Sequence, residues 1–158
     1  MRVLFLLLLC AVSYQAQVKG CKTDYDKFKD VTHYHCYGIL KQGFISFMNV
    51  SVSVRETGNA AFQFSTVRSD LRFLRNREMT LLLDETDRYT IAVSDTDARA
   101  TYLGNLSQSL IFQVSREMLE TIAAAKKVEV KIGSAEGKLD DGLLKKLKAA
   151  VEFVAKSK

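Results

Sequence analysis

The sequence contains no proline and no tryptophan, and its 158 residues include two histidines, three cysteines and eight glycines. Because proline is absent, the turns must depend on glycine, asparagine, aspartate and serine. The sequence also lacks a low-complexity linker, a repeat of solenoid length and a sharp change of composition ahead of Ser115. We therefore expect a single β-rich domain over residues 18–158.

A long hydrophobic run is also missing. The longest apolar run, Val3 to Val12, is short for a membrane-spanning helix, which needs about 20 apolar residues. It follows the cationic Arg2 and precedes small and polar residues, which is the pattern of a secretory signal peptide. We predict a signal peptide over residues 1–17 and a periplasmic or extracellular, secreted protein. Cys10 leaves lipidation as an alternative.

The cysteines support the same prediction. Removal of the signal peptide would leave two of them, Cys21 and Cys36. An even pair in an oxidising compartment is typical of a disulfide bond. Closing a loop of this length removes about 3 kcal/mol of entropy from the unfolded chain. The predicted bond would join the N-terminal segment to the strand that carries Cys36.

Apolar and polar residues alternate from residue 31 to residue 114, which indicates strands. Two hairpins are expected, one over residues 48–64 and one over residues 79–93, with polar turns at Glu56–Asn59 and Asp84–Asp87. Further strands are expected at about 98–103 and 108–114, and Asp95 and Asp97 are expected in a turn.

The pattern becomes helical after Ser115, which can cap a helix whose inner face carries Met118, Leu119 and Ile122. A strand over residues 128–133 follows, and a short return strand begins at Lys138. Asp140 or Asp141 then caps a final helix. The sequence predicts a mainly β (α+β) fold: an antiparallel β-sandwich or curved sheet with two helices near the C-terminus.

Three stretches carry a family resemblance: FKDVTHYHCY, RFLRNREMTLLLDETDRYTI and VSREMLETIAAAKKVEVKIGSAEGKLDDGLLKKLKAAVEF. Together they resemble a family of secreted or lipid-anchored bacterial β-sandwich-like domains with a C-terminal helix-strand-helix closure. The resemblance implies this architecture and a bacterial origin, and it implies no activity. The sequence departs from the family in having no tryptophan in its first strand and central hairpin.

The stretch His33-Tyr34-His35-Cys36 holds both histidines and one cysteine. On a strand, His33 and His35 lie on one face and Cys36 on the other, so the three cannot converge on one metal ion. We therefore expect rim histidines beside a disulfide and no metal or other cofactor, with His33 and His35 as weak metal candidates. The nearby carboxylates have no motif spacing and are expected in a solvated segment: Asp24, Asp26 and Asp30.

No catalytic motif stands out in the sequence. A serine hydrolase would need a supporting turn such as G-x-S-x-G, which does not occur. Glycosidase-type carboxylates pair in space and leave no motif. We expect a non-enzymatic binding or structural module of the bacterial envelope, with no catalytic residues to name. The alternatives are a small carboxylate-dependent hydrolase and an inhibitor or immunity-type protein.

The net charge is +5, and the excess lies at the C-terminal end, where residues 126–158 hold nine lysines and five acidic residues. Such a surface is typical of a solvated helix face, or of weak attraction to an anionic surface. We expect a monomer that contacts a protein or an envelope component. Nucleic acid is not expected as a partner, because Arg72 and Phe73 would point opposite ways on a strand. The candidate contact residues are Arg72, Arg75, Arg77, Lys145, Lys146 and Lys148.

Overall fold

The computed structural model describes residues 18–29, 31–42, 46–68, 73–101 and 104–156. The predicted fold class is confirmed: the chain forms one curled antiparallel sheet, a half-barrel, with two α-helices, one of them near the C-terminus. The predicted signal peptide (residues 1–17), Cys10 and Arg72 lie outside the described residues. In the described ranges, no helix is long and apolar enough to cross a membrane.

The elements follow one another along the chain as strands, with a short 3-10 helix (η1) in the middle and both α-helices in the last third. They are β1 (Cys21–Asp26), β2 (Val31–Gln42), β3 (Ser46–Arg55), β4 (Ala60–Arg68), η1 (Phe73–Arg75), β5 (Glu78–Leu83), β6 (Asp87–Ala92), β7 (Asp95–Ala100), β8 (Leu106–Val114), α1 (Arg116–Ala124), β9 (Val128–Ile132), β10 (Ala135–Leu139) and α2 (Asp141–Lys156).

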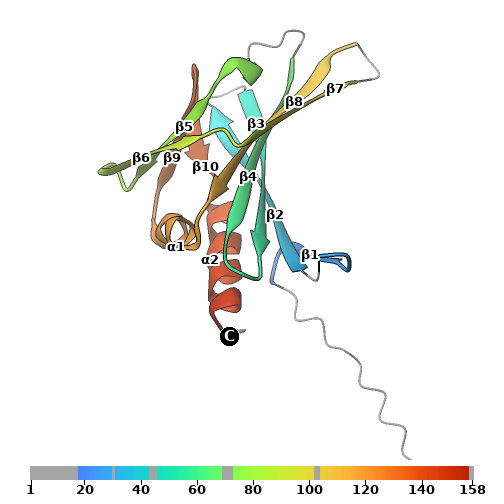
Figure 1. Ribbon diagram of the computed structural model, residues 1–158. Helices are drawn as coiled ribbons and strands as arrows, with labels where there is room; N and C mark the ends of the chain where they lie inside the picture. The colour runs from blue at the N-terminus through green and yellow to red at the C-terminus, as the bar shows by residue number, and fades with distance from the viewer. Residues whose placement is uncertain (1–17, 30, 43–45, 69–72, 102–103, 157–158) are drawn as a thin grey trace, which may run out of the picture.

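The strands lie in the order β6-β5-β9-β10-β2-β3-β4-β8-β7, and β1 pairs with β2 outside this path. The long strand β2 shares one edge between two neighbours, with β1 on its first half and β10 near its end. The outermost strands β6 and β7 are consecutive in the chain, joined by residues 93–94. The sheet must therefore curl until its two edges approach each other, as Figure 1 shows.

The inner face of the curled sheet forms the core because apolar residues alternate along its strands. Met48, Val50, Val52 and Val54 of β3 are all buried, as are Phe62 and Phe64 of β4. Both helices lie at one end of the sheet, where α2 packs against β2 and α1 packs against α2. The buried stripe of α2 comprises Leu143, Leu144, Leu147, Ala150 and Val154.

Both predicted hairpins and both predicted helix starts are confirmed. Strand β3 pairs with β4, and β5 pairs with β6. The side chain of Ser115 accepts a hydrogen bond from the N–H of Met118 at 3.3 Å. Asp140 rather than Asp141 caps α2, because its Oδ1 accepts from the N–H of Leu143 at 2.9 Å.

Three local features differ from expectation. Asp24 and Asp26 belong to a strand that the sequence did not predict, because β1 pairs with β2 along its whole length; Asp24 is exposed, as expected, and Asp30 lies outside the described residues. Phe73 is buried in η1 and does not lie on a strand. Asp95 and Asp97 lie in β7 rather than in a turn, since they pair with Ile111 and Ser109 of β8.

Candidate functional site

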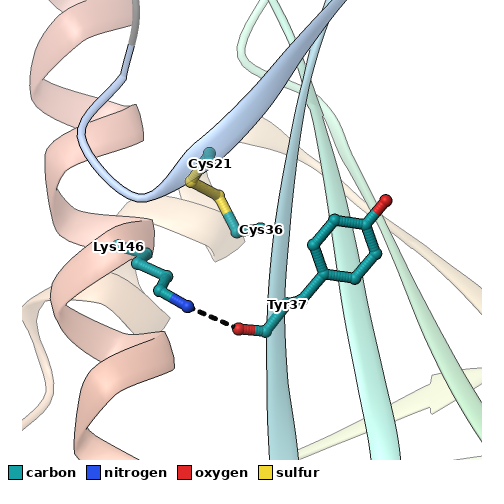
Figure 2. The surroundings of a disulfide bond; sticks show 4 residues. All are labelled: Cys21, Cys36, Tyr37 and Lys146. Carbon is teal, nitrogen blue, oxygen red and sulfur yellow. Dashed lines mark hydrogen bonds between the residues drawn. A yellow bond between two sulfur atoms is a disulfide. The ribbon is translucent and has the colours of Figure 1, made fainter.

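The predicted disulfide bond is present. Cys21 and Cys36 are opposite each other in the β1–β2 register, and their Sγ atoms are 2.01 Å apart. Both cysteines are buried on the inner face. Figure 2 shows that Lys146 of α2 lies beside this bond and donates from Nζ to the carbonyl oxygen of Tyr37 at 2.8 Å. The contact candidate Lys146 therefore fastens α2 to β2.

The two histidines lie on the opposite, outer face of β2, as the strand pattern predicts. Their ring centroids are 5.9 Å apart and the ring planes differ by 13°. His33 Nδ1 lies 3.2 Å from Ser53 Oγ on β3. Burial, and next the charge of His33, lower the pKa of His35, while the charge of Asp24 opposes them. Over the described ranges, no three His, Cys, Asp or Glu side chains gather closely enough to hold a metal ion.

The end of α1 and the first turns of α2 enclose a groove of about 390 Å³, which we call the lysine groove. Its lining consists of Ala123, Ala124, Ala125, Lys126, Asp141, Leu144, Lys145 and Lys148. Two of the predicted contact residues, Lys145 and Lys148, thus lie in one groove with Lys126, which the sequence did not single out. In the described part of the chain, none of these three ammonium groups has an ion-pair partner.

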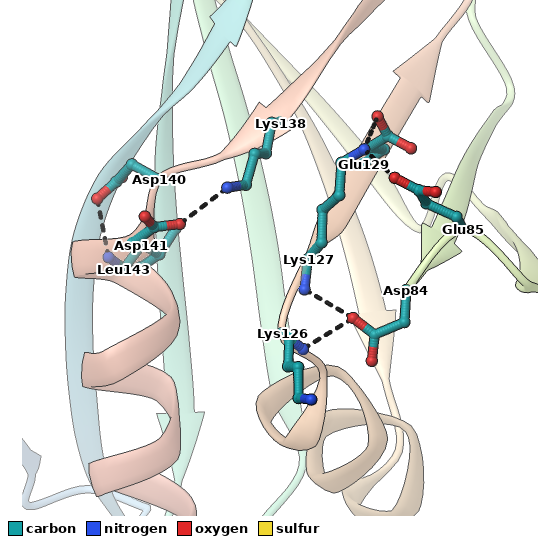
Figure 3. A network of polar contacts seen from close by, with 9 residues as sticks. All are labelled: Asp84, Glu85, Lys126, Lys127, Glu129, Lys138, Asp140, Asp141 and Leu143. Atoms are coloured by element: carbon teal, nitrogen blue, oxygen red, sulfur yellow. Dashed lines mark hydrogen bonds and ion pairs between the residues drawn. The ribbon is translucent and has the colours of Figure 1, made fainter.

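Two lysines next to the groove are paired with carboxylates, as Figure 3 shows. Lys127 Nζ lies 2.8 Å from Glu85 and 3.0 Å from Glu129. The hydrogen bond from Lys127 lowers the pKa of Glu85, and the bonds to Glu85 and then Glu129 raise the pKa of Lys127. Lys138 Nζ lies 3.1 Å from Asp141. Lys126, Lys145 and Lys148 therefore stay without a paired carboxylate around the lysine groove, while Lys127 and Lys138 beside it are paired.

The β5–β6 turn fixes the segment that carries Lys126. Asp84 has a positive φ of 48°, and its Oδ1 accepts from the N–H groups of Lys126 and Lys127 at 2.9 and 2.8 Å. The N–H of Asp84 donates to the carbonyl oxygen of Lys127 at 2.9 Å. Sequence analysis placed Asp84 in a polar turn. It missed this clamp because the bonded amides lie more than 40 residues away in the chain.

The arginine candidates lie elsewhere. Arg75 and Arg77 are exposed and line a separate hollow of about 370 Å³ with Glu78, Lys131 and other residues. This hollow lies at the start of β5, whereas Asp84 and the lysine groove lie beyond its end. The structure therefore separates the described arginine candidates from the lysine candidates.

Two carboxylates, Glu129 and Glu136, line a hollow of about 180 Å³ on the outer face of β9 and β10. Each is paired with a lysine, Glu129 with Lys127 at 3.0 Å and Glu136 with Lys131 at 3.7 Å. Such pairs are typical of a charged surface. The hydrolase alternative gains no candidate acid or base from this hollow and stays a prediction.

Comparisons with protein-family models, with curated proteins and with solved structures give no match. The resemblance to a bacterial family therefore stays a prediction.

Proposed function

We propose that the chain is an exported, non-enzymatic binding module, and that its lysine groove holds an acidic segment of an envelope protein. The observation that carries this proposal is the placement of three unpaired lysines, Lys126, Lys145 and Lys148, around one groove. Neighbouring lysines are already paired with carboxylates. An acidic segment would supply the missing counter-charges.

The groove also has an apolar floor. Leu144 is 7% exposed and Ala123 is also 7% exposed, and both line the groove beneath the lysines. A peptide that alternates acidic and apolar side chains fits such a surface better than a purely acidic one. Its carboxylates reach the lysines while its apolar side chains leave water. This floor favours a peptide over a flat lipid surface.

The export component of the proposal is supported by the buried Cys21–Cys36 bond. Disulfides persist in oxidising compartments and are rare in the cytosol of mesophiles. A periplasmic or extracellular location is therefore proposed together with the binding role. Detection of the processed protein with its disulfide in a periplasmic or culture fraction would test the location separately.

The binding role is tested with two short peptides, one of glutamate alone and one in which glutamate and leucine alternate. Isothermal titration should give tighter binding of the alternating peptide. The triple variant Lys126→Gln, Lys145→Gln, Lys148→Gln should bind it about tenfold more weakly, since exposed ion pairs contribute roughly 0.2–1 kcal/mol each. Added salt should weaken binding to the unaltered protein more than binding to the variant.

A charge-matched control is the triple variant Lys19→Gln, Lys22→Gln, Lys27→Gln, whose lysines are exposed and lie far from the groove lining in sequence. It should bind the peptide as the unaltered protein does. Equal losses in both variants would refute a specific groove, because the attraction would then follow net charge alone. Preference for anionic over zwitterionic vesicles, with no peptide binding, would also refute the peptide proposal.

A further inference from the structure

The outer face of β2 carries a second group of side chains that the lysine groove does not involve. His33 and His35 are two residues apart on one strand, so both imidazoles leave the same face. Their centroids are 5.9 Å apart with nearly parallel planes, and both side chains are half-buried. Binding of one metal ion would place it about 2.0 Å from one nitrogen of each ring.

Ser53 on β3 orients the ring of His33 for metal binding. When Nδ1 carries the proton, it donates to Ser53 Oγ at 3.2 Å and leaves the lone pair on Nε2. Metal-binding histidines usually donate their other N–H to a protein oxygen, which fixes the ring and its tautomer. His35 lies directly opposite Ser53 in the β2–β3 register, so its ring leaves the same face as that of His33. Both rings thus present nitrogen ligands.

We propose that His33 and His35 together bind one Cu²⁺ ion on the outer face of β2. A structural zinc site takes four ligands, and two imidazoles fall short of that number. Cu²⁺ binds nitrogen ligands more tightly than the other divalent first-row ions and accepts water in its remaining positions. Cys36 faces the other side of the sheet within its disulfide, so the site offers nitrogen and oxygen donors and no thiolate.

The neighbouring strands set the affinity. Asp24 of β1 is paired with His33 across the sheet and supplies a negative charge on the same face, although it does not join the two histidines in a three-ligand cluster. Lys22 faces His35 from β1, and Arg55 faces His33 from β3. These two cations oppose a bound cation, while Asp24 offsets them. The site should therefore bind Cu²⁺ reversibly, with micromolar rather than nanomolar affinity.

The test is a titration of the purified, disulfide-bonded protein with a Cu²⁺ salt, followed by calorimetry and electron paramagnetic resonance. We expect one equivalent of Cu²⁺ and a spectrum with splitting from two nitrogens. His33→Asn and His35→Asn should each weaken binding at least about tenfold, and Ser53→Ala should weaken it severalfold by freeing the His33 ring. Zn²⁺ should compete at least tenfold less well.

A chain amino terminus also binds copper, so the double variant His33→Asn, His35→Asn is the deciding control. It should lose the two-nitrogen spectrum while keeping the unfolding midpoint of the unaltered protein in a chelator. An unchanged affinity and spectrum in this variant would overturn the proposal. Binding of several weak equivalents that neither single variant reduces would overturn it as well. Either failure would leave the lysine groove unaffected.

Discussion

Replacement of Asp140 tests how α2 is attached to the sheet. Its two carboxylate oxygens accept two backbone hydrogen bonds that lie far apart in sequence. Oδ1 accepts from the N–H of Leu143 at 2.9 Å and caps α2. Oδ2 accepts from the N–H of Ile39 in β2 at 2.8 Å, across 101 residues of chain. One side chain therefore both starts the last helix and joins it to the central strand.

The cost of Asp140→Ala can be worked from these two bonds. Loss of a helix cap destabilises a protein by about 1 kcal/mol. Loss of a part-buried hydrogen bond to a charged group costs roughly 1.5–3 kcal/mol. We expect Asp140→Ala to lower the free energy of unfolding by about 3 kcal/mol. Asp140→Asn should lose about 2 kcal/mol, because asparagine caps equally well but turns an N–H group toward the N–H of Ile39.

The assay is urea unfolding at neutral pH, with the denaturant dependence compared among the variants. Asp141→Asn is the matched control, since Asp141 starts the same helix but is exposed and has a surface ion pair with Lys138. It should cost less than about 1 kcal/mol. The reasoning is refuted if Asp140→Ala and Asp141→Asn have equal midpoints, or if Asp140→Asn is less stable than Asp140→Ala.

Three further predictions concern the same core. Gly38→Ala should lower the free energy of unfolding by about 1–3 kcal/mol, because the added Cβ would lie 2.6 Å from the Cβ of Leu143. A chemical-denaturation midpoint equal to that of the unaltered protein would contradict this packing. Replacing Cys21 and Cys36 together by serine should lower the free energy of unfolding by about 3 kcal/mol. A reducing agent should destabilise the unaltered protein by a similar amount and leave the variant unchanged. Burial, and next the charge of Glu56, raise the pKa of Tyr34. The contribution of Tyr34 to stability should therefore be fully present below a pH of about 10 and should be lost as the pH rises through this raised pKa. Thermal melts at alkaline pH should show a smaller fall in unfolding temperature for Tyr34→Phe than for the unaltered protein.

Local features of the fold could be predicted because each depends on residues close in sequence. The alternation from Met48 to Val54 and the return at Phe62 and Phe64 define the β3–β4 hairpin. Ser115 gives a recognisable helix cap. The disulfide followed from the two cysteines that remain after the predicted signal peptide and from the expected compartment. Hydrophobic period and capping chemistry are local properties, so the sequence displays them directly.

The order of strands could not be predicted, because pairing partners are set by packing between distant segments. Strand β10 returns to β2, and its Leu139 pairs with Leu40. This pairing carries β9 and the β5–β6 hairpin to the side of β2 opposite β3. No periodicity in the chain distinguishes this curled sheet from two stacked sheets, which is why both were expected. Strand β1 was missed because its exposed polar residues resemble those of a loop.

The candidate site was predicted in part. Lysines off the apolar stripe of α2 follow from helical periodicity, so Lys145 and Lys148 could be named. Lys126 joins them only because the clamp from Asp84 holds the segment after α1 against the start of α2. Lys146 looked equivalent in the sequence, but its ammonium group bonds the backbone of β2. Which charges remain unpaired depends on the tertiary structure.

The joining of β6 and β7 by residues 93–94 has a consequence for how the half-barrel could open. The N–H of Val93 donates to the carbonyl oxygen of Arg77 at 2.8 Å, and the N–H of Ser94 donates to the carbonyl oxygen of Ile111 at 2.8 Å. This short link therefore bonds to both sides of the seam where the two edges of the sheet meet. A protease cut between Val93 and Ser94 would detach the two rims from each other while each kept one neighbouring strand. The nicked chain should then open locally along this seam and expose the inner face of the sheet, while the central strands stay paired.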